Sequence, residues 1–551
     1  MESFRYFSTG FPSLFFQIFS LETASLEKCL LYDIIYLMIL DDYRNERLRK
    51  LEEIRARGIE PYPSKSERNT RIFDVVNHFD EKQGQEVCIA GRIVAIRSFG
   101  KLVFIKLRDY SGEVQIFMKQ LDNSDHSAPL GHTQGRSAEP TVLGEGVAQN
   151  YIGIKDIKLL DVGDFIEAKG VVDKSQTGEI SVFTDHVRLL TKSLRPLPEK
   201  FTNKEERYRR RYVDMNVNPE VRERLVRRSK FWQATRDFMN KHGFIEINIP
   251  VLEHTTGGAD ANPFVTHMDA LDEDFYLRIS HELPLKRLLG GGFEKVYDIG
   301  PRFRNEGVDD EHLPEHIAFE AYAAYENYED GMKFYEEMMK YVAKETWGTL
   351  KFNVGGFEID LDQEWPRYKY ADLLKDKFGV DVFNPDREQL IKILLENWDA
   401  KDLKREDFVK KLENTTTPHL IDDVWKLIRK TSAGPYWVIE EPLSLSPLAK
   451  KSADNPLVTE RFHPVIAGTE MGNGFSELND PLDQLGRFEE QQAARDAGDE
   501  EAQMMDMDFV EMLEYGMPPA CGWGNSERNF WLLEGVSGRE AVPFPTMRKI
   551  D

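Results

Sequence analysis

The chain has 551 residues, of which 41% are hydrophobic and 30% charged, so we expect an ordinary globular protein with two or more domains. The formal net charge of −24 argues against a protein that coats nucleic acid by bulk electrostatics, although a local basic surface can still bind RNA. Cys29, Cys88 and Cys521 lie far apart, which excludes a disulfide framework and a CxxC metal site and favours a reducing, cytoplasmic location.

The first 66 residues are predicted to form an N-terminal extension followed by a helix. Residues 1–40 hold two apolar runs, both shorter than the ~18–20 residues of a membrane span. No cationic segment precedes them, so we expect neither a signal peptide nor a membrane partner. Met38 stands just before a charged pattern, and we expect translation to start there. The pattern over 41–57 predicts a helix with Leu48, Leu51 and Ile54 on one face.

A small closed barrel is predicted over residues 67–192. Apolar side chains alternate with other side chains over 87–121 and again over 164–172 and 179–187, which is typical of strands. Glycine turns join these strands. Residues 122–150 are rich in glycine, serine and proline and lack periodicity, so we expect a loop insertion there. The stretch from Leu194 to Pro198 marks the start of a linker over 193–218.

The linker and the helix after it are locally basic. Arginines crowd residues 205–212 and return at Arg222, Arg224, Arg227 and Arg228. A basic surface of this kind is compatible with RNA binding. From composition alone, a solvated linker and helix face is the more frequent explanation, and we interpret the run in that way.

Residues 219–551 are predicted to form a second, α+β domain. Val221, Leu225, Trp232 and Met239 lie on one helical stripe that ends at Gly243. A strand over 244–249 and a helix over 328–347 follow. Strands and helices are interspersed without a βαβ rhythm or a GxGxxG loop, which favours α+β.

A pair of strands over 293–325 carries the first group of polar residues. Because the side-chain period of a strand is two, Arg302, Arg304 and Glu306 point the same way. After a loop, His316, Ala318, Glu320 and Tyr322 share a face. A binding site and a structural ion-pair network both fit this pattern, and the residues alone leave the two interpretations open.

Two later segments also place polar residues beside glycines. In the stretch 472–480, Asn473, Phe475 and Glu477 share a strand face, with Glu470 just upstream. A strand that ends in a polar turn needs no ligand, so this signal is ambiguous. Residues 521–528 form a glycine-rich entry to a helix over 529–534 and carry Arg528, a pattern compatible with phosphate binding but weak by itself.

Taken together, these segments resemble class II lysyl-tRNA synthetases over roughly residues 45–551. In the second domain the matching fragments are 211–214, 257–259, 263–267, 276–279, 303–307 (FRNEG), 446–450 and 473–480 (NGFSELND). In the barrel they are 90–92, 176–179 and 194–198. Several motifs thus occur in the order that the family has.

The resemblance implies an N-terminal OB-fold β-barrel that binds the anticodon, followed by an antiparallel sheet flanked by helices. Motif one, at 221–250, implies a homodimer; motif two spans 293–325, and motif three centres on Arg528. The implied activity is lysine–tRNA ligation: ATP activates L-lysine to lysyl-adenylate, and the lysyl group passes to the 3′ end of tRNA(Lys). Mg²⁺ bridges the phosphates of ATP.

The resemblance also assigns the ATP site. Arg304 contacts the α-phosphate, Arg528 the γ-phosphate, and Glu306 the adenine amino group. Arg304 and Arg528 are the catalytic residues, because cations stabilise negative charge on the phosphoryl oxygens. The complete expected ATP-binding set is Arg304, Glu306, His312, His316, Glu470 and Arg528.

Lysine recognition has an electrostatic basis, since a long ammonium side chain needs buried acceptors and no competing cation. By resemblance, Glu477 and Tyr322 meet the ε-ammonium and Glu282 meets the α-ammonium. The full expected lysine-binding set is Glu282, Glu320, Tyr322, Asn473, Phe475 and Glu477. The expected anticodon-binding set, for a UUU or CUU anticodon, is Arg97, Phe104, Gln115 and Glu179. An exposed Phe104 can stack an unpaired base, although a loop could also cover this side chain.

Three positions depart from the family pattern. His463 stands where the family has a metal-binding glutamate, so in the expected metal pair of Glu470 and His463 only Glu470 is a secure ligand. His316 replaces the phenylalanine that stacks on adenine. Motif three has the sequence GWGNSER where the family has GLGIGIDR, which shifts the glycines relative to Arg528.

Three rival functions remain. An aspartyl- or asparaginyl-tRNA synthetase shares the architecture, but the glutamates of the pocket argue against it. A synthetase-like enzyme that lysylates proteins lacks the anticodon barrel, which is predicted here. A noncatalytic RNA-binding paralogue is disfavoured because Arg304, Glu306 and Arg528 are all retained, whereas the change at His463 keeps it open.

Overall fold

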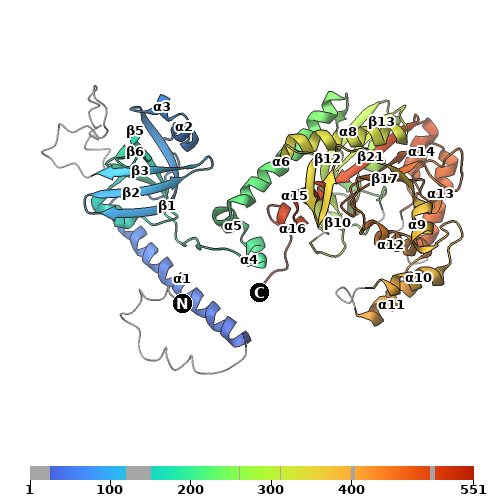
Figure 1. The fold of residues 1–551 in the computed structure, drawn as a ribbon, viewed down its shortest axis with the longest axis horizontal. Helices are drawn as coiled ribbons and strands as arrows, with labels where there is room; N and C mark the ends of the chain where they lie inside the picture. Colours follow the sequence, from blue (N-terminus) through green and yellow to red (C-terminus); the bar gives the residue numbers. More distant parts are fainter. Residues whose placement is uncertain are drawn as a thin grey trace. The chain divides into compact units, whose positions relative to one another are not determined.

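The computed structural model describes residues 25–119, 150–259, 261–310, 312–398, 404–496 and 503–550. The chain divides into two compact units, Met1–Lys200 and Phe201–Asp551, and the division falls inside the predicted linker (Figure 1). None of the helices within the described ranges is long and apolar enough to cross a membrane. The expected insertion (except residue 150) and the first 24 residues lie outside the described part of the chain.

Five strands of the first unit close into the predicted barrel. They are hydrogen-bonded in the order β1, β2, β3, β6, β5, and β1 also pairs with β5. Only the β3–β6 pair among them is parallel. The strands are β1 (Glu86–Phe99), β2 (Leu102–Arg108), β3 (Glu113–Lys119), β5 (Phe165–Lys174) and β6 (Ile180–Thr184). The other elements are α1 (Ser25–Ala56), α2 (Ile72–Asn77), α3 (Phe79–Lys82), η4 (Ile154–Leu159), β4 (Tyr151–Gly153) and β7 (His186–Thr191).

The barrel interior follows the alternation in the sequence. Val103, Ile105 and Leu107 of β2 are buried, whereas Phe104 points outward and is partly exposed. The prediction of one strand over 179–187 was wrong, because the chain changes partners at Asp185. Strand β6 pairs with β3 and β5, whereas β7 pairs with β5 and β4.

The basic stretch at the start of the second unit is held in ion pairs. Arg207 and Arg211 both contact Asp214 at 2.8 Å, in the helices α4 (Lys204–Arg209) and α5 (Arg211–Val217). Arg227 pairs with Glu534 at 2.6 Å. Arg207, Arg211 and Arg227 thus take part in ion pairs within the unit, and Arg211, at 2% exposure, is buried and not solvated as expected.

A nine-stranded, mainly antiparallel sheet forms the centre of the second unit. Its order is β16, β17, β18, β20, β21, β13, β12, β8, and β19 pairs with β18. Only the outer pairs β16–β17 and β12–β8 are parallel. The strands are β8 (Ile245–Glu246), β12 (Lys295–Phe303), β13 (Glu315–Ala324), β16 (Arg367–Lys369), β17 (Tyr436–Ile439), β18 (Arg461–Ile466), β19 (Thr469–Glu470), β20 (Asn473–Ser476) and β21 (Ala520–Ser526).

Two long helices, α6 (Pro219–Lys241) and α8 (Tyr328–Trp347), pack together against the central strands through a shared hydrophobic core (Figure 1). Both were predicted. Asn327 caps α8 by accepting hydrogen bonds from two backbone N–H groups, and Gly348 ends the helix with a φ of 74°. The predicted strand over 244–249 is reduced to β8, because beyond Glu246 only the N–H of Ile247 reaches the neighbouring strand.

Shorter elements surround the sheet and complete the α+β fold. The helices are α7 (Glu282–Gly290), α9 (Tyr370–Phe378), α10 (Arg387–Glu396), α11 (Arg405–Asn414), α12 (Thr417–Arg429), α13 (Pro481–Asp496), α14 (Met507–Tyr515), α15 (Arg528–Glu534), α16 (Gly538–Ala541) and η5 (Leu443–Leu445). The remaining strands are β9 (Leu252–Glu253), β10 (Val265–Met268), β11 (Glu273–Leu277), β14 (Lys351–Val354) and β15 (Phe357–Asp360).

Candidate active site

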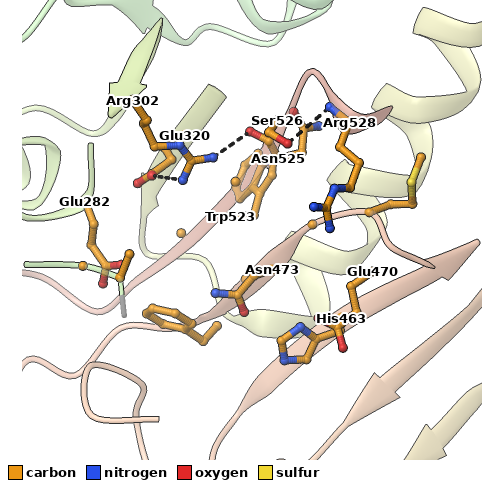
Figure 2. Close-up of a pocket in the computed structure, with 18 of the residues that line it drawn as sticks. Glu282, Arg302, Glu320, His463, Glu470, Asn473, Trp523, Asn525, Ser526 and Arg528 are labelled. Atoms are coloured by element: carbon orange, nitrogen blue, oxygen red, sulfur yellow. Dashed lines mark hydrogen bonds and ion pairs between the residues drawn. The ribbon is translucent and has the colours of Figure 1, made fainter. Parts of the chain in front are cut away.

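A cavity of about 440 Å³ in the second unit gathers most of the predicted site residues. Figure 2 shows Glu282 and Glu320 toward one end, and His463, Glu470 and Arg528 toward the other. The predicted residues that line it are Glu282, Arg304, Glu306, His312, His316, Glu320, Tyr322, His463, Glu470, Asn473, Phe475 and Arg528. Glu477 is the exception, since it is buried behind the wall at 1% exposure.

Strand geometry explains why these side chains converge. His316, Glu320 and Tyr322 of β13 are at alternate positions and share a face. On β21 the residues opposite Glu320 and Tyr322 are Gly524 and Gly522. A Cβ at Gly524 would lie 2.8 Å from Cγ of Glu320, so the glycines of motif three make room for the side chains of the neighbouring strand.

We call one end of the cavity, together with the buried groups behind its wall, the acidic end. It is defined by Glu282, which lines the cavity, and by Glu477 and the lysine that joins them. Nζ of Lys286 lies 2.5 Å from Oε1 of Glu282 and 2.5 Å from Oε2 of Glu477. The Lys286 side chain is 0% exposed, and its ammonium is 5.2 Å from the ring centroid of Phe475. Sequence reasoning missed Lys286. Its spacing of four residues from Glu282 on a helix was the available signal.

The acidic end holds one ammonium between two buried carboxylates. Burial raises the pKa of Glu477 to about 8, although the charge of Lys286 acts in the opposite direction. Burial also raises the pKa of Glu282. Both shifts have the same cause: an ionised carboxylate without full compensation is costly in an interior of low dielectric. The acidic end therefore favours the arrival of another cation.

Glu320 lies beside the acidic end but already has its own partners. It accepts hydrogen bonds from the hydroxyls of Ser280 (2.9 Å) and Tyr322 (3.1 Å), and Arg302 contacts it at 3.2 Å. Burial by itself would raise the pKa of Glu320, but hydrogen bonding by His281 and the charge of Arg302 prevail and lower it to about 2. Glu320 is thus an ionised anchor for Arg302, which the alternation in the sequence placed on the same face as Arg304 but which was not among the expected site residues.

Asn473 and Phe475 form the wall between the two ends. Oδ1 of Asn473 accepts a hydrogen bond of 2.9 Å from Nε of Arg461. This arginine also contacts Glu441 at 2.7 Å, so Asn473 is held in one orientation.

The second part of the cavity, which we call the arginine end, is defined by Arg304, Arg528 and His316. Nε of Arg304 is buried and has no hydrogen-bond partner among the described residues. Burial, together with the charges of Arg302 and Arg304, holds the pKa of His316 well below its usual range. The imidazole is therefore neutral at physiological pH, which suits an aromatic surface beside cations.

The loop of motif two borders the arginine end. His312 and Glu306 both line the cavity and are exposed. Nδ1 of His312 lies 2.9 Å from Oδ2 of Asp309, which holds the imidazole within the loop. Both side chains are therefore accessible to a ligand in the cavity.

The anticodon residues predicted by resemblance lie on the barrel, in the first unit. Phe104 is on the outer face of β2, and its ring is edge-on to Phe99 and Phe117 at centroid distances of 6.1 and 5.0 Å. Arg97 is opposite Phe104 on β1. Gln115 lies on β3 and donates to Ser181 at 2.9 Å. Glu179 is exposed just before β6. The barrel thus presents an aromatic row with polar neighbours.

Comparisons with known proteins agree with this arrangement. Residues 203–548 match the family described as tRNA synthetases class II (D, K and N), and residues 87–130 match the OB-fold nucleic acid binding domain. The lysine–tRNA ligase of Thermotoga maritima is 40% identical over 93% of this chain and 97% of its own length. That of Moorella thermoacetica is 41% identical over 92% and 98%. The chain belongs to the class II lysine–tRNA ligase family.

Membership in the family confirms the OB-fold barrel and the class II sheet. The predicted Mg²⁺ ligands, Glu470 and His463, can then be compared with what the ion requires. Nε1 of Trp425 donates to Oε1 of Glu470, and Nε of Arg429 lies 3.6 Å from the same oxygen. Nε2 of His463 lies 3.3 Å from Glu441. In the described ranges no three His, Cys, Asp or Glu side chains are arranged around one metal position.

These contacts use one of the two oxygens of Glu470. They therefore fit an ion held mainly by ATP phosphates, with one carboxylate oxygen from the protein, which is a common mode for Mg²⁺. They fit an ion held by Glu470 and His463 together less well, because Mg²⁺ prefers oxygen ligands and Nε2 of the imidazole already contacts Glu441.

Proposed function

We propose that this class II ligase activates L-lysine with ATP and transfers the lysyl group to the 3′ end of tRNA(Lys). One observation carries the proposal: Glu282 of the acidic end lines the same cavity as Arg304, Arg528 and His316 of the arginine end. A cationic amino acid at the acidic end has its carboxylate directed toward phosphates at the arginine end. The chemistry is attack of that carboxylate on the α-phosphorus, which releases pyrophosphate.

Neither step needs a protein nucleophile, so the residues act by positioning and by electrostatics. Arg304 and Arg528 stabilise the negative charge that develops on the phosphoryl oxygens. Glu306 accepts from the adenine amino group, and the neutral imidazole of His316 stacks on the base. Glu470 would hold Mg²⁺ together with the phosphates, and the ion would supply further positive charge.

Selection for lysine follows from the charges at the acidic end. Two carboxylates, Glu282 and Glu477, face the single ammonium of Lys286. A substrate with an ammonium side chain completes this balance, whereas aspartate would add a third carboxylate. The buried Lys286 does not line the cavity, so it is not positioned to recognise an acidic substrate in the way an aspartate-specific relative requires.

ATP–pyrophosphate exchange, measured with each standard amino acid in turn, tests the proposed substrate. We expect exchange with lysine and none above background with aspartate or asparagine. Exchange with aspartate or asparagine would support the first rival function. A protein that binds lysine tRNA but supports no exchange with any amino acid would support the noncatalytic one.

We also propose that the outer face of the barrel binds the anticodon, with Phe104 stacked on an unpaired base. Aromatic stacking contributes about 1–3 kcal/mol per base. Phe104→Ala is therefore expected to lower kcat/KM for tRNA(Lys) by about tenfold and to leave lysine-dependent exchange unchanged. Phe73→Ala, at a partly exposed phenylalanine of α2, is the matched control. Intact aminoacylation by the Phe104 variant would contradict this role.

Finally, we propose a homodimer formed around motif one, that is, α6 and β8. Apolar side chains next to this region are exposed in the single chain, among them Ile245 at 52% and Val265 at 60%. Burying such side chains against a second copy is favourable. Light scattering after size-exclusion chromatography is expected to give twice the chain mass, and the mass of one chain would refute the dimer.

A further inference from the structure

We propose that Lys286 is a positioning and specificity residue, whose buried ammonium neutralises one of the two carboxylates at the acidic end and leaves the other for the side chain of the substrate. This inference rests on the proposed specificity for lysine, and it gives Lys286 of the protein a role in that specificity. It also implies that substrate binding is coupled to the release of a proton.

The geometry fixes Lys286 as a permanent member of the pocket. Its ammonium is 5.2 Å from the ring of Phe475 and 5.9 Å from the ring of Phe509, and it contacts both carboxylates at 2.5 Å. The side chain has no exposed surface. Because every one of these contacts is buried, Lys286 is a fixed charge behind the wall of the cavity and not a mobile surface cation.

One carboxylate oxygen remains available to a substrate. Oε1 of Glu477 is buried and has no hydrogen-bond partner within the described part of the chain. A Cβ at Gly522 would collide with this oxygen and with the ring of Tyr322. Gly522 and Tyr322 both line the cavity. Oε1 therefore lies next to two residues that line the cavity, one of which has no side chain.

The surrounding charges leave a deficit of one cation. When all groups are ionised, Glu282, Glu477 and Lys286 sum to −1, and the charge of Glu320 is already paired with Arg302. The titratable and charged groups that act on this trio from the neighbouring elements are Glu320, Tyr322, Arg461 and Cys521. None of them supplies an ammonium to Oε1 of Glu477.

A buried carboxylate that lacks a cation takes up a proton instead. In agreement with this, the pKa of Glu477 is raised to about 8. Below that pH the proton must leave before the substrate ammonium can pair with Glu477. Lysine affinity is therefore expected to rise with pH, by about tenfold per unit below the pKa, and to level off above it.

The alternative is that Lys286 only anchors α7. To separate the two roles we use Lys286→Met, which keeps the length of the side chain and removes its charge. The matched control is Lys340→Met on α8, which removes an i,i+4 ion pair with Glu336 (2.7 Å) outside the cavity. Circular dichroism and thermal melting establish that each variant is folded.

The experiment is calorimetric titration of the full-length protein with lysine, in buffers of different ionisation enthalpy, at about pH 6.5, 7.5 and 8.5. The wild type and Lys340→Met are expected to release about one proton per lysine at the lowest pH and much less at the highest. Lys286→Met is expected to bind lysine at least about tenfold more weakly at the middle pH and to release a proton even at the highest.

A Lys286→Met protein with wild-type proton release, or with equal weakening at every pH, would show an anchoring role only and overturn the inference. If this variant does not fold, the wild type alone still tests the inference. Lysine binding by the wild type without proton release at the lowest pH also overturns the inference. A wild type that binds no lysine at any pH would instead refute the proposed function itself.

Discussion

The two ends of the cavity differ in how far the protein has satisfied its own polar groups. At the acidic end, Lys286 bridges two buried carboxylates, and beside it the buried Glu320 is paired with Arg302. At the arginine end, Nε of Arg304 has no partner in the described ranges, and Glu306 is exposed. The acidic end thus holds its charged groups in place and lacks one cation at Oε1 of Glu477, whereas the arginine end needs nucleotide phosphates to complete it.

The largest effect is expected at the arginine end. Arg304→Ala removes a cation that stabilises charge on the transferred phosphoryl group, and loss of such a group costs about 2.7–4 kcal/mol. We therefore expect lysine-dependent exchange to fall by about a hundred- to a thousandfold. Arg367→Ala, at a surface arginine paired with Glu329, is the control and should leave the rate unchanged. A fall of less than tenfold in kcat would contradict the catalytic role of Arg304.

The acidic end is expected to tolerate no added volume. In Gly522→Ala the new Cβ collides with Glu477 and Tyr322, so lysine binding should weaken by about a hundredfold, or ~2.7 kcal/mol. Binding of ATP, measured separately, should be unchanged because the arginine end is untouched. Gly486→Ala on α13, where a Cβ meets nothing, is the control. Equal loss of ATP and lysine binding would show that the two ends are not independent.

Removing one charge at the acidic end should have a smaller effect. Glu477→Gln keeps the shape but loses the carboxylate, and we expect KM for lysine in the exchange reaction to rise at least about tenfold, or ~1.4 kcal/mol. KM for ATP should stay constant. Glu336→Gln, which alters a surface ion pair on α8, serves as the control. An unaltered KM for lysine would refute the assignment of Glu477.

The smallest effect is expected from restoring the family residue at 316. His316→Phe offers adenine a larger aromatic face, and the gain in stacking should lower KM for ATP by about two- to threefold. KM for lysine should not change. A higher KM for ATP would mean that the neutral imidazole makes a polar contact with the nucleotide. The arginine end would then bind ATP through His316 as well as through its arginines.

Part of the fold could be read directly from local pattern. The period of two placed Val103, Ile105 and Leu107 inside the barrel, and it placed His316, Glu320 and Tyr322 on one face of β13. The helix predicted over 328–347 has the same bounds as α8. The break at Asp185 was missed, although the core side chains shift from an even position before it, Val182, to odd positions after it, Val187 and Leu189.

The site was predicted less completely, for a physical reason. Motifs identify residues that contact a ligand, but they do not reveal which residues satisfy one another. The pair Arg302–Glu320 and the contact of Trp425 with Glu470 join residues from different elements of the second unit. Likewise, the sequence did not reveal that Nε2 of His463 contacts Glu441, a contact that bears on the predicted metal pair of Glu470 and His463.

By itself, the sequence determined the order of elements, the buried faces and the family, since these depend on local periodicity and on motifs in a fixed order. The tertiary structure alone decided the charge balance of the pocket, because that balance depends on distance in space. Lys286 and Glu477 lie far apart along the chain, and only the packing of α7 against the sheet brings an ammonium within 2.5 Å of that carboxylate. Burial then makes the resulting deficit of one cation costly enough to favour a cationic substrate.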